Sequence, residues 1–400
     1  MIALSNAASI HDLRRLAKRR LPGFAFDFID GGAEDEISLR KNRAALDAIE
    51  LTPRYLTGAM EPNLETEVFG KSYSVPFGVA PVGFMNMAWP GADLALARLA
   101  AKNRMAHVVS TASSTSLEEI AEAAEGYAWF QLYVTREETV VEELLRRSWA
   151  AGYRVLVVTV DVPEAGKRDR DIRNGLRIPF RPNLRLAADL ALHPRWSLGT
   201  LLAGPPHLAN FSEKGGSLSL VDIQKLLISS YFDWSHFRRL RDKWDGQVLL
   251  KGILHPDDAL RAVEEGCDGI VVSNHGGRQL DYGPASIAAL PGVVKAVGDR
   301  VPLILDSGIR RGADAIRAKA LGASFLLAGR AFAYGAAAGG EAGAKKAFEI
   351  LRRELSVALG QLGTQDYAAV DRTVLFDAAG GKSGTRLNLG ISPDRSEAAQ

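Results

Sequence analysis

Residues 270–281 read IVVSNHGGRQLD, an apolar and β-branched run that breaks into a polar turn with paired glycines. Such a run predicts a buried strand, and the turn marks the end of that strand. Ser273, His275 and Arg278 therefore leave the carboxyl end of one strand together. Ligands bind at this edge in parallel α/β folds, which makes His275 a candidate functional residue rather than a packing or surface histidine.

The same pattern recurs along the chain, where short apolar strands alternate with stretches of helical apolar spacing. Ser116 and Thr135 are each followed three residues later by a glutamate, the spacing of a capping box at a helix start. Eight strands with intervening helices predict an α/β fold of the (β/α)8 TIM barrel type. A doubly wound open sheet is the alternative, disfavoured because no Gly-x-Gly-x-x-Gly follows the first strand. The predicted strands are residues 77–80, 107–110, 129–133, 155–160, 248–251, 270–273, 303–305 and 325–328.

The barrel is predicted to span residues 75–372. An N-terminal helical arm and lead-in, residues 1–74, precede it. A C-terminal tail, residues 373–400, follows and is rich in Gly, Ser, Asp and Arg, a composition typical of poorly ordered chain ends.

A long insertion, residues 176–240, follows the fourth predicted strand, since far more chain lies there than one βα unit needs. Residues 196–212 carry no formal charge and follow several arginines. Trp and Leu beside Arg suit a membrane interface, so residues 184–212 are predicted to make a peripheral membrane contact. A lid or a subunit contact is the alternative.

Composition limits the classes of function. The chain has 400 residues, a formal net charge of +2 and one cysteine. These values argue against a nucleic-acid partner, a disulfide framework or a thiolate metal cage, and no spacing predicts a metal site. Cys267 precedes the sixth strand, on the face opposite His275, which disfavours a role as nucleophile.

Two features of the sequence bear on localisation. The basic N-terminal region lacks an apolar core, so a secretory signal is not expected. No uncharged apolar run is long enough to span a bilayer. The expected location is the cytoplasm, free or peripheral on the inner face of the cell membrane.

Lys, Asp or Arg ends five of the eight predicted strands. Buried charges need partners, so charges gathered at one edge indicate a site. Glycine-rich turns after strands seven and eight, with Arg310 and Arg330, predict a phosphate site. Lys251, deep in a barrel mouth, predicts a negative group opposite it, such as an anionic cofactor ring.

The remaining strand-end residues predict acid–base chemistry. Asp161 can orient His275 and stabilise its imidazolium, so that His275 acts as a general base. Arg278 and Arg168 could bind a carboxylate through paired hydrogen bonds, although Arg168 could also be a solvated loop charge. The set indicates proton removal beside a carboxylate, next to a phosphate-bearing redox ring.

These residues resemble the FMN-dependent 2-hydroxy acid oxidase and dehydrogenase family, which includes glycolate oxidase, lactate dehydrogenase and mandelate dehydrogenase. The resemblance runs from about residue 21 to 359 and implies a TIM barrel with FMN at its mouth, an (S)-2-hydroxy acid substrate and a homotetramer. Residues 193–210 look most like the membrane-associated bacterial L-lactate dehydrogenases. The motifs that carry the resemblance are GGAED (31–35), FQLYV (130–134), TVD (159–161), LKG (250–252) and SNHGGRQLD (273–281).

The resemblance also implies roles for individual residues. His275 would be the base and Asp161 its partner, while Tyr133, Arg168 and Arg278 would bind substrate. Lys251 would lie at the N1/O2 edge of the flavin and stabilise its reduced, anionic form. The implied cofactor contacts are Pro81, Val82 and Gly83 along the flavin, Ser110, Gln131, Thr159 and Ser273 as polar partners, and Asp306, Ser307, Gly308, Arg310, Gly329 and Arg330 at the ribityl and phosphate.

Two substrate-binding positions depart from the family pattern. Phe28 stands where a carboxylate-binding tyrosine is usual, which removes a hydrogen bond worth about 0.5–1.5 kcal/mol. Ala112 stands where glycolate oxidase has tryptophan, which leaves room. Together they favour a larger or aromatic side chain on the substrate.

The site residues together with the insertion favour a dehydrogenase that passes electrons to a membrane quinone. An oxidase that reduces O2 to hydrogen peroxide is the nearest alternative. A non-catalytic flavin-binding scaffold and a flavin-dependent isomerase are alternatives from other classes.

Overall fold

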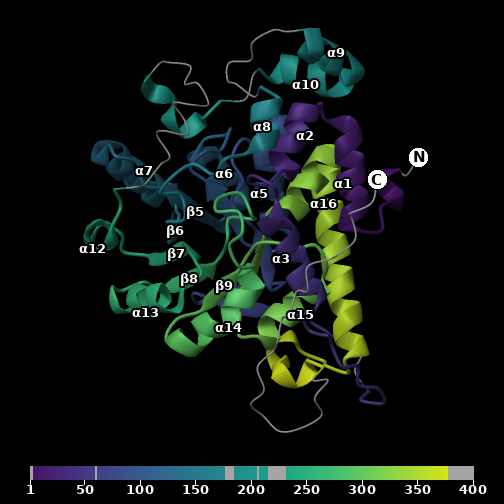
Figure 1. Cartoon of the computed structure of the whole chain (residues 1–400), viewed down its shortest axis with the longest axis vertical. Helices are drawn as coiled ribbons and strands as arrows, with labels where there is room; N and C mark the ends of the chain where they lie inside the picture. The colour runs from purple at the N-terminus through teal and green to yellow at the C-terminus, as the bar shows by residue number, and fades with distance from the viewer. Residues whose placement is uncertain (1–2, 59–60, 176–183, 205–206, 215–230, 377–400) are drawn as a thin grey trace, which may run out of the picture.

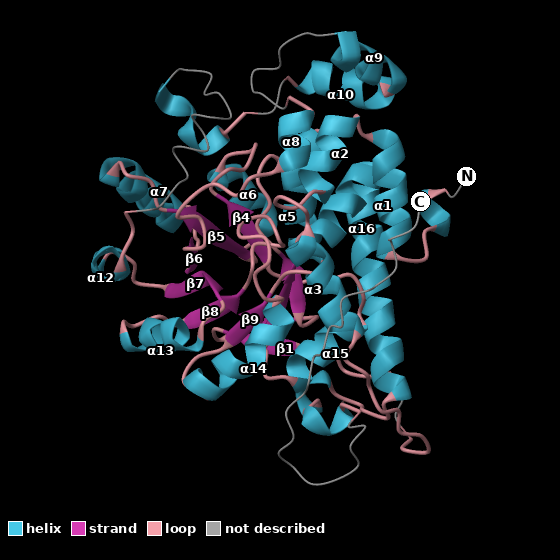
Figure 2. Cartoon of the chain, viewed as in Figure 1, coloured by secondary structure: helices cyan, strands magenta, loops and turns pink. Residues whose placement is uncertain are grey.

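The computed structural model describes residues 3–58, 61–175, 184–204, 207–214 and 231–376 (Figure 1). Eight parallel strands close into a barrel in the order β10-β3-β4-β5-β6-β7-β8-β9 (Figure 2). Each predicted strand lies within two residues of an observed one, so the TIM barrel is confirmed and the open-sheet alternative is wrong. The strands are β3 (Phe77–Val79), β4 (His107–Ser110), β5 (Ala128–Tyr133), β6 (Val155–Thr159), β7 (Gln247–Ile253), β8 (Gly269–Val272), β9 (Leu303–Leu305) and β10 (Phe325–Ala328).

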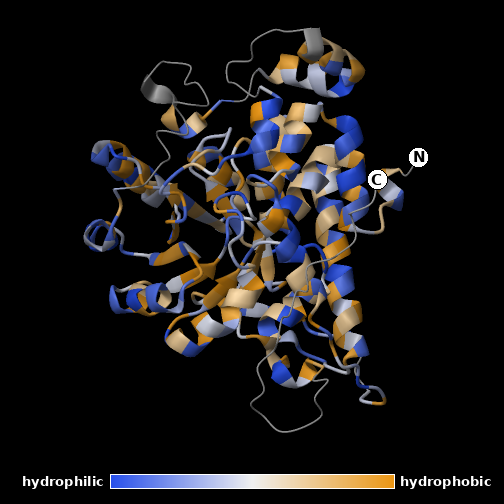
Figure 3. Ribbon diagram, viewed as in Figure 1, coloured by the Kyte–Doolittle hydropathy of each residue, from blue (hydrophilic) through white to orange (hydrophobic). Residues whose placement is uncertain are grey.

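Both faces of the strands are buried, which explains their continuous apolar sequences. Alternate residues fill the barrel interior, as Trp129 and Ile304 do, or pack outward against helices, as Phe130 and Leu305 do. Figure 3 shows the strands in hydrophobic colours, whereas the surrounding helices carry both kinds of residue.

The helices that follow the strands form the outer layer of the barrel. The Ser116 capping box is present, but the predicted Thr135 box is wrong: the helix begins at Glu138 after the N-cap Glu137, and the Thr135 hydroxyl donates to the Glu137 carbonyl instead. The last helix is interrupted at Gly339 and Gly340. The bounds are α4 (Met85–Ala88), α5 (Ala92–Lys102), α6 (Leu117–Ala124), α7 (Glu138–Ala150), α13 (Pro256–Glu264), α14 (Ser286–Val297), α15 (Ala313–Ala320) and α16 (Arg330–Gln361), followed by the 3-10 turns η3 (Tyr367–Ala369) and η4 (Arg372–Val374).

The N-terminal arm packs on the barrel from two directions. Helix α1 runs along α16 (Figure 1), whereas the β1–β2 hairpin covers the amino ends of the strands. There the ring of Phe69 contacts Trp129, whose Nε1 donates to the Tyr73 hydroxyl over 3.0 Å. The arm contains η1 (Leu4–Asn6), α1 (Ile10–Arg20), α2 (Gly23–Asp30), α3 (Ile37–Asp47), β1 (Thr66–Val68) and β2 (Lys71–Tyr73).

Between β6 and β7 lie α8 (Asp169–Arg173), α9 (Leu184–Leu192), α10 (Pro194–Ala203), η2 (Ala209–Lys214) and α12 (Trp234–Asp242). Figure 1 shows α9 and α10 at one end of the molecule, beyond α2 and α8. Residues 176–183, 205–206 and 215–230 of the predicted insertion, and residues 377–400 of the predicted C-terminal tail, lie outside the described residues. Within the described part of the chain, every helix is too short or too polar to cross a membrane.

The loop after β8 joins the arm to the barrel. The Asp281 carboxylate accepts hydrogen bonds from the amides of Ile37 and Ser38 at 3.1 and 2.7 Å, and so caps the start of α3. Gly277 has a φ of +71°, and a Cβ there would lie 2.5 Å from the Leu39 amide nitrogen. The second glycine of the pair is therefore required both by its backbone conformation and by the close approach of α3.

A buried carboxylate on α15 makes the second connection to the arm. Asp314 is fully buried, accepts from the guanidinium of Arg43 on α3 at 2.6 Å, and also accepts from the amides of Arg310 and Arg311. We expect Asp314→Asn to lower the free energy of unfolding by about 3–5 kcal/mol, because it leaves Arg43 without its buried partner. Urea titration of the purified protein measures this loss.

Asp47→Asn is the matched control, since Asp47 pairs with the same Arg43 but its side chain is 60% exposed. Its expected cost is about 1 kcal/mol or less. Equal losses in the two variants would contradict a special role for the buried pair.

Candidate active site

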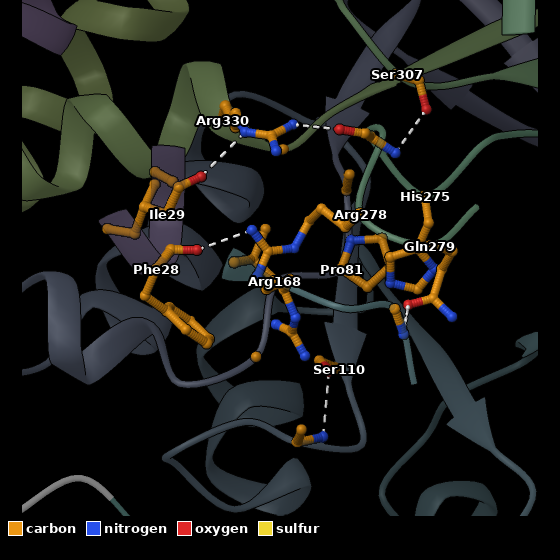
Figure 4. A pocket seen from close by; sticks show the side chains of 18 of the residues that line it. Phe28, Ile29, Pro81, Ser110, Arg168, His275, Arg278, Gln279, Ser307 and Arg330 are labelled. Carbon is orange, nitrogen blue, oxygen red and sulfur yellow. Dashed lines mark hydrogen bonds between the residues drawn. The ribbon is translucent and has the colours of Figure 1, made fainter. Parts of the chain in front are cut away.

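A cavity of about 600 Å³ opens at the carboxyl ends of the strands, within the rough range of 300–1,000 Å³ for small-molecule sites (Figure 4). All the predicted site residues line it except Asp161, Gln131 and Ser273, and each of these is bonded directly to a lining residue. The structure therefore brings the whole predicted set together. The lining members are Phe28, Pro81, Val82, Gly83, Ser110, Ala112, Tyr133, Thr159, Arg168, Lys251, His275, Arg278, Asp306, Ser307, Gly308, Arg310, Gly329 and Arg330.

His275 lies between a carboxylate and a phenol. Its Nδ1 is 2.9 Å from Asp161 Oδ1, and its Nε2 is 3.3 Å from the Tyr133 hydroxyl. An ionised carboxylate can only accept, so Nδ1 carries the proton and Nε2 keeps a lone pair toward the cavity. Burial opposes ionisation of Asp161, but His275 and Lys251 outweigh it and hold the pKa of this carboxyl below its usual value.

Burial lowers the pKa of His275, and Lys251 and Arg278 add to this effect, while Asp161 offsets it only in part. The imidazole is therefore neutral at neutral pH and able to accept a proton at Nε2. Asp161 supplies the charge that would stabilise the imidazolium once it forms.

The backbone of His275 is left-handed, with a φ of +57°, which is costly for a residue with a side chain. Two serines hold this conformation. The His275 amide donates to Ser273 Oγ at 3.0 Å, and the next amide, of Gly276, donates to Ser307 Oγ at 2.9 Å. The turn thereby directs the imidazole into the cavity.

Gly252 allows Asp161 to approach. It has a φ of +111° at a bulge in β7, and a Cβ there would lie 2.5 Å from the Asp161 Cβ. Any other residue would displace the carboxylate from His275. Sequence reasoning quoted this glycine in a motif but gave it no role, because a backbone angle and a contact across two strands cannot be read from one position.

Lys251 is buried at the base of the cavity. Its ammonium donates to Ser273 Oγ at 3.2 Å and lies 3.5 Å from Asp306. Burial opposes the charge, but Asp306 and Asp161 outweigh it and raise the pKa of Lys251. Ser273 thus contacts both the ammonium and the backbone of His275, which couples the two.

Two arginines bind the last carbonyls of α2, which have no helical partners. Arg278 Nη1 donates to the carbonyls of Phe28 and Gly31 at 2.9 and 2.7 Å, while Arg330 donates to those of Ile29 and Gly31 and to Gly276 across the cavity (Figure 4). Sequence reasoning assigned these side chains to ligands alone. In the described structure Arg278 keeps Nε and Nη2 for a ligand, whereas most of Arg330 is bound to the chain.

The lining has more positive than negative groups. Its carboxylates are Asp171 and Asp306, and its cations are Lys167, Arg168, Lys251, Arg278, Arg310 and Arg330. Burial together with Arg168 and Arg330 lowers the pKa of Arg278, as expected where buried cations face one another without enough counter-charge. The cavity is suited to anionic groups such as a phosphate and a carboxylate.

Three polar side chains span adjacent strands on one wall. Gln131 Oε1 accepts from the Ser110 hydroxyl at 3.2 Å, and its Nε2 donates to Thr159 Oγ1 at 2.9 Å. They form a row across β4, β5 and β6 that can present donors and acceptors to a flat polar ring. One part of the lining is apolar, and there the Phe28 ring packs edge-on against Phe84 with 6.2 Å between the ring centroids.

Gln279 is a further lining residue that sequence reasoning missed. Its side-chain amide donates to the carbonyls of Asp161 and Glu164, and its oxygen accepts from the amide of Gly166. It fixes the loop after β6. Its place in the 270–281 motif, one residue after Arg278, was the available signal.

The fold and the cavity define a class of protein: a TIM barrel with a candidate general base at the carboxyl ends of its strands. The cavity around this base is rich in cations that suit a phosphate. A model of the family described as FMN-dependent dehydrogenase matches residues 17–377, and the chain belongs to this family, whose cofactor is FMN.

The residues present fit that cofactor. The buried Lys251 ammonium could face an anionic ring, and the row of Ser110, Gln131 and Thr159 could bond to a polar ring. Arg310, which lines the cavity near Gly308 and Gly329, could bind a phosphate.

Two curated relatives are similar along almost their full length. (S)-Mandelate dehydrogenase of Pseudomonas putida is 39% identical over 369 residues, 91% of this chain and 93% of the relative. L-Lactate dehydrogenase of Xanthomonas campestris pv. campestris (strain B100) is 41% identical over 369 residues, 91% of this chain and 95% of the relative.

Solved structures with the same fold are also similar to this chain. The crystal structure of the monotopic membrane protein (S)-mandelate dehydrogenase aligns with a TM-score of 0.89 and 38% identity, covering 93% of this chain and 99% of the other. A mandelate oxidase structure aligns with a TM-score of 0.78 and 37% identity, covering 92% and 97%.

The contact between His275 and Asp161 generates a prediction on protonation. Because the carboxylate favours the imidazolium, Asp161→Asn should move the pKa of His275 to lower pH than in the unaltered protein. NMR titration of ring-labelled histidine measures it, with the His275 signal assigned by its absence from His275→Gln. A shift to higher pH would contradict the described contact.

Proposed function

We propose that the protein oxidises an (S)-2-hydroxy acid with a bulky apolar side chain to the 2-oxo acid and passes the electrons to a membrane quinone. The arrangement of His275 between Asp161 and Tyr133, beside Arg278, is the observation that carries the proposal. It joins a neutral base to cations that suit a carboxylate.

The polar residues of the cavity have separate roles in this reaction. Nε2 of His275 takes a proton from the substrate, and Asp161 stabilises the imidazolium that results. Arg278, through Nε and Nη2, and Arg168 bind the carboxylate. Bound FMN supplies the acceptor for two electrons. The Lys251 ammonium stabilises negative charge next to it. Hydride transfer and carbanion formation are both compatible with a base at this position.

The apolar wall supports a bulky substrate. Phe28, Phe84, Ala112, Val162 and Ile172 line the cavity, and the small Ala112 leaves space beside the aromatic rings. Phe28 has a second role: its ring lies 5.4 Å from the Arg278 guanidinium, a cation–π contact worth about 0.5–1 kcal/mol. The ring therefore helps to hold Arg278 although it lacks the hydroxyl usual at this position.

A panel of hydroxy acids tests the proposal. Mixed anaerobically with the yellow protein, (S)-mandelate should bleach the flavin faster than (S)-lactate, because its ring can occupy the apolar wall. The His275→Gln variant should still bind FMN, but its flavin should be reduced about 10²- to 10⁴-fold more slowly. The absorbance decay measures both.

Faster reduction by lactate would contradict the bulky-substrate proposal, and near-normal reduction by His275→Gln would remove this residue from the base role. If no 2-hydroxy acid bleached the flavin, the binding-scaffold alternative would stand. The oxidase alternative has support in the similarity to mandelate oxidase. Reoxidation of the reduced protein by air and by a quinone separates the two, since fast peroxide formation would favour the oxidase.

The outer surface of α9 and α10 supports the proposal of a membrane quinone as electron acceptor. Leu192, Leu198, Leu201 and Leu202 form this surface, here called the leucine surface, and each is more than half exposed. On the inner side, Trp196 is buried, donates from Nε1 to the Met87 carbonyl at 2.8 Å and packs edge-on against Phe24. Two helices fixed to the barrel thus present leucines outward.

A lipid bilayer is the occupant proposed for the leucine surface. The exposed Arg195 on α10 suits anionic headgroups, and the similar (S)-mandelate dehydrogenase structure is described as a monotopic membrane protein. Ile172 of α8 is exposed yet lines the cavity, so the mouth has an apolar edge. An apolar edge at the mouth is suited to a lipophilic electron acceptor such as a quinone.

Replacing Leu198, Leu201 and Leu202 with glutamine should reduce binding to anionic lipid vesicles at least about tenfold, because each buried leucine contributes about 1.5–3 kcal/mol. Co-sedimentation measures it. The control is Leu56→Gln with Val357→Gln, two exposed apolar residues elsewhere. Unchanged binding, or an equal loss in the control, would contradict the membrane surface.

A further inference from the structure

Helix α8 carries Arg168 at its N-cap and Arg170 in its first turn. Arg168 lines the cavity. Arg170 instead reaches α2 and the loop after it, where its guanidinium pairs with Asp27 at 3.3 Å, with Asp30 at 3.0 Å and with Glu36. At the other end of α8, Asn174 Nδ2 donates to Asp27 Oδ2 at 2.7 Å.

The side chain of Arg168 makes few polar contacts that would fix its position. Its nearest carboxylate is Asp171 on the same helix, at 3.7 Å, and in the described structure its buried Nε has no hydrogen-bond partner. A helix of five residues is not stable by itself, so α8 depends on tertiary contacts. The position of Arg168 therefore depends on how α8 is fastened.

The ion pairs that attach α8 to α2 and the loop after it are formed by groups that stay charged. Burial opposes ionisation of Asp30, but Arg14, Tyr334 and Arg170 outweigh it and hold its pKa well below the usual value. Burial likewise opposes the charge of Arg170, yet Glu36 and Asp30 raise its pKa. Both partners stay ionised throughout the neutral range, and they join the segment that carries Arg168 to the helix whose carbonyls bind Arg278.

We infer that Arg170 is a positioning residue, which holds Arg168 at the cavity so that Arg168 and Arg278 bind the substrate carboxylate together. This inference rests on the proposed function. It gives Arg170 an effect on carboxylate binding without contact with the substrate.

Arg170→Met tests it in the FMN-loaded protein. KM for the best 2-hydroxy acid of the panel should rise about tenfold, the scale of one charge-assisted hydrogen bond, while kcat stays within about threefold. The methyl ester of the same acid lacks the carboxylate, so its KM should not change between the variants. A residue that only stabilised the fold would alter acid and ester alike.

Arg173→Met is the matched control. Arg173 lies in the same helix, but its partner is Asp169 of α8 itself and its side chain is 70% exposed. KM should be unchanged there. In a double-mutant cycle, Arg170→Met should add little once Arg168 is replaced by methionine, since Arg170 acts through Arg168.

The outcomes separate the two levels of the proposal. If the unaltered protein reduces its flavin with hydroxy acids but Arg170→Met has the KM of Arg173→Met, or the ester is affected equally, Arg170 does not position Arg168. If no hydroxy acid reduces the unaltered protein, the proposed function itself fails. Should Arg170→Met lose FMN, Asp27→Asn loosens the same attachment while the Arg14–Asp30 pair remains, and it must show the same selective rise in KM.

Discussion

The left-handed turn at His275, Gly276 and Gly277 links the barrel, the N-terminal arm and the cavity. Its conformation is costly and persists because serine hydroxyls bind its amides and because α3 packs against the second glycine. The same loop binds the C-terminal carbonyls of α2 through Arg278 and caps α3 through Asp281. One turn thus sets the imidazole, the arm and the mouth of the cavity in a fixed relation.

Electrostatics of the cavity follow from burial with unequal numbers of charges. Cations outnumber carboxylates in the lining, so the cavity carries positive charge that the protein does not balance. An anionic cofactor and an anionic substrate would balance this charge. Burial is the main cause of the lowered pKa of His275, and the cations Lys251 and Arg278 add to it. The cations that suit anionic groups therefore also contribute to keeping the base neutral.

The connection between β6 and β7 has two parts with different contacts. Its first part, α8, borders the cavity and is joined by ion pairs to α2. Its later part, α9 and α10, is held by Trp196 and presents the leucine surface outward. Helix α2 contacts both parts, since the Gly23 amide at its start binds Asp189 of α9 and Asp27 binds α8. A membrane contact and a substrate site would thus share one supporting helix.

The barrel and the central group of site residues could be predicted from residue type and order alone. Buried parallel strands need continuous apolar runs, and the residues just after such runs must meet at one edge, so His275, Asp161 and Lys251 could be grouped without a structure. Local patterns were weaker: the capping box at Ser116 formed, whereas the one at Thr135 did not, because its hydroxyl bonds within the loop.

The hydrogen-bond partners and close contacts of the site residues became apparent only from the packing of separate elements. Arg330 is committed mainly to backbone carbonyls, Gly252 makes room for Asp161, and Arg170 fastens the helix that carries Arg168. These contacts join segments more than 80 residues apart or depend on backbone angles, and neither leaves a periodic trace in sequence. Residue type and spacing report burial and direction along one element, whereas hydrogen-bond partners are set by how separate elements pack.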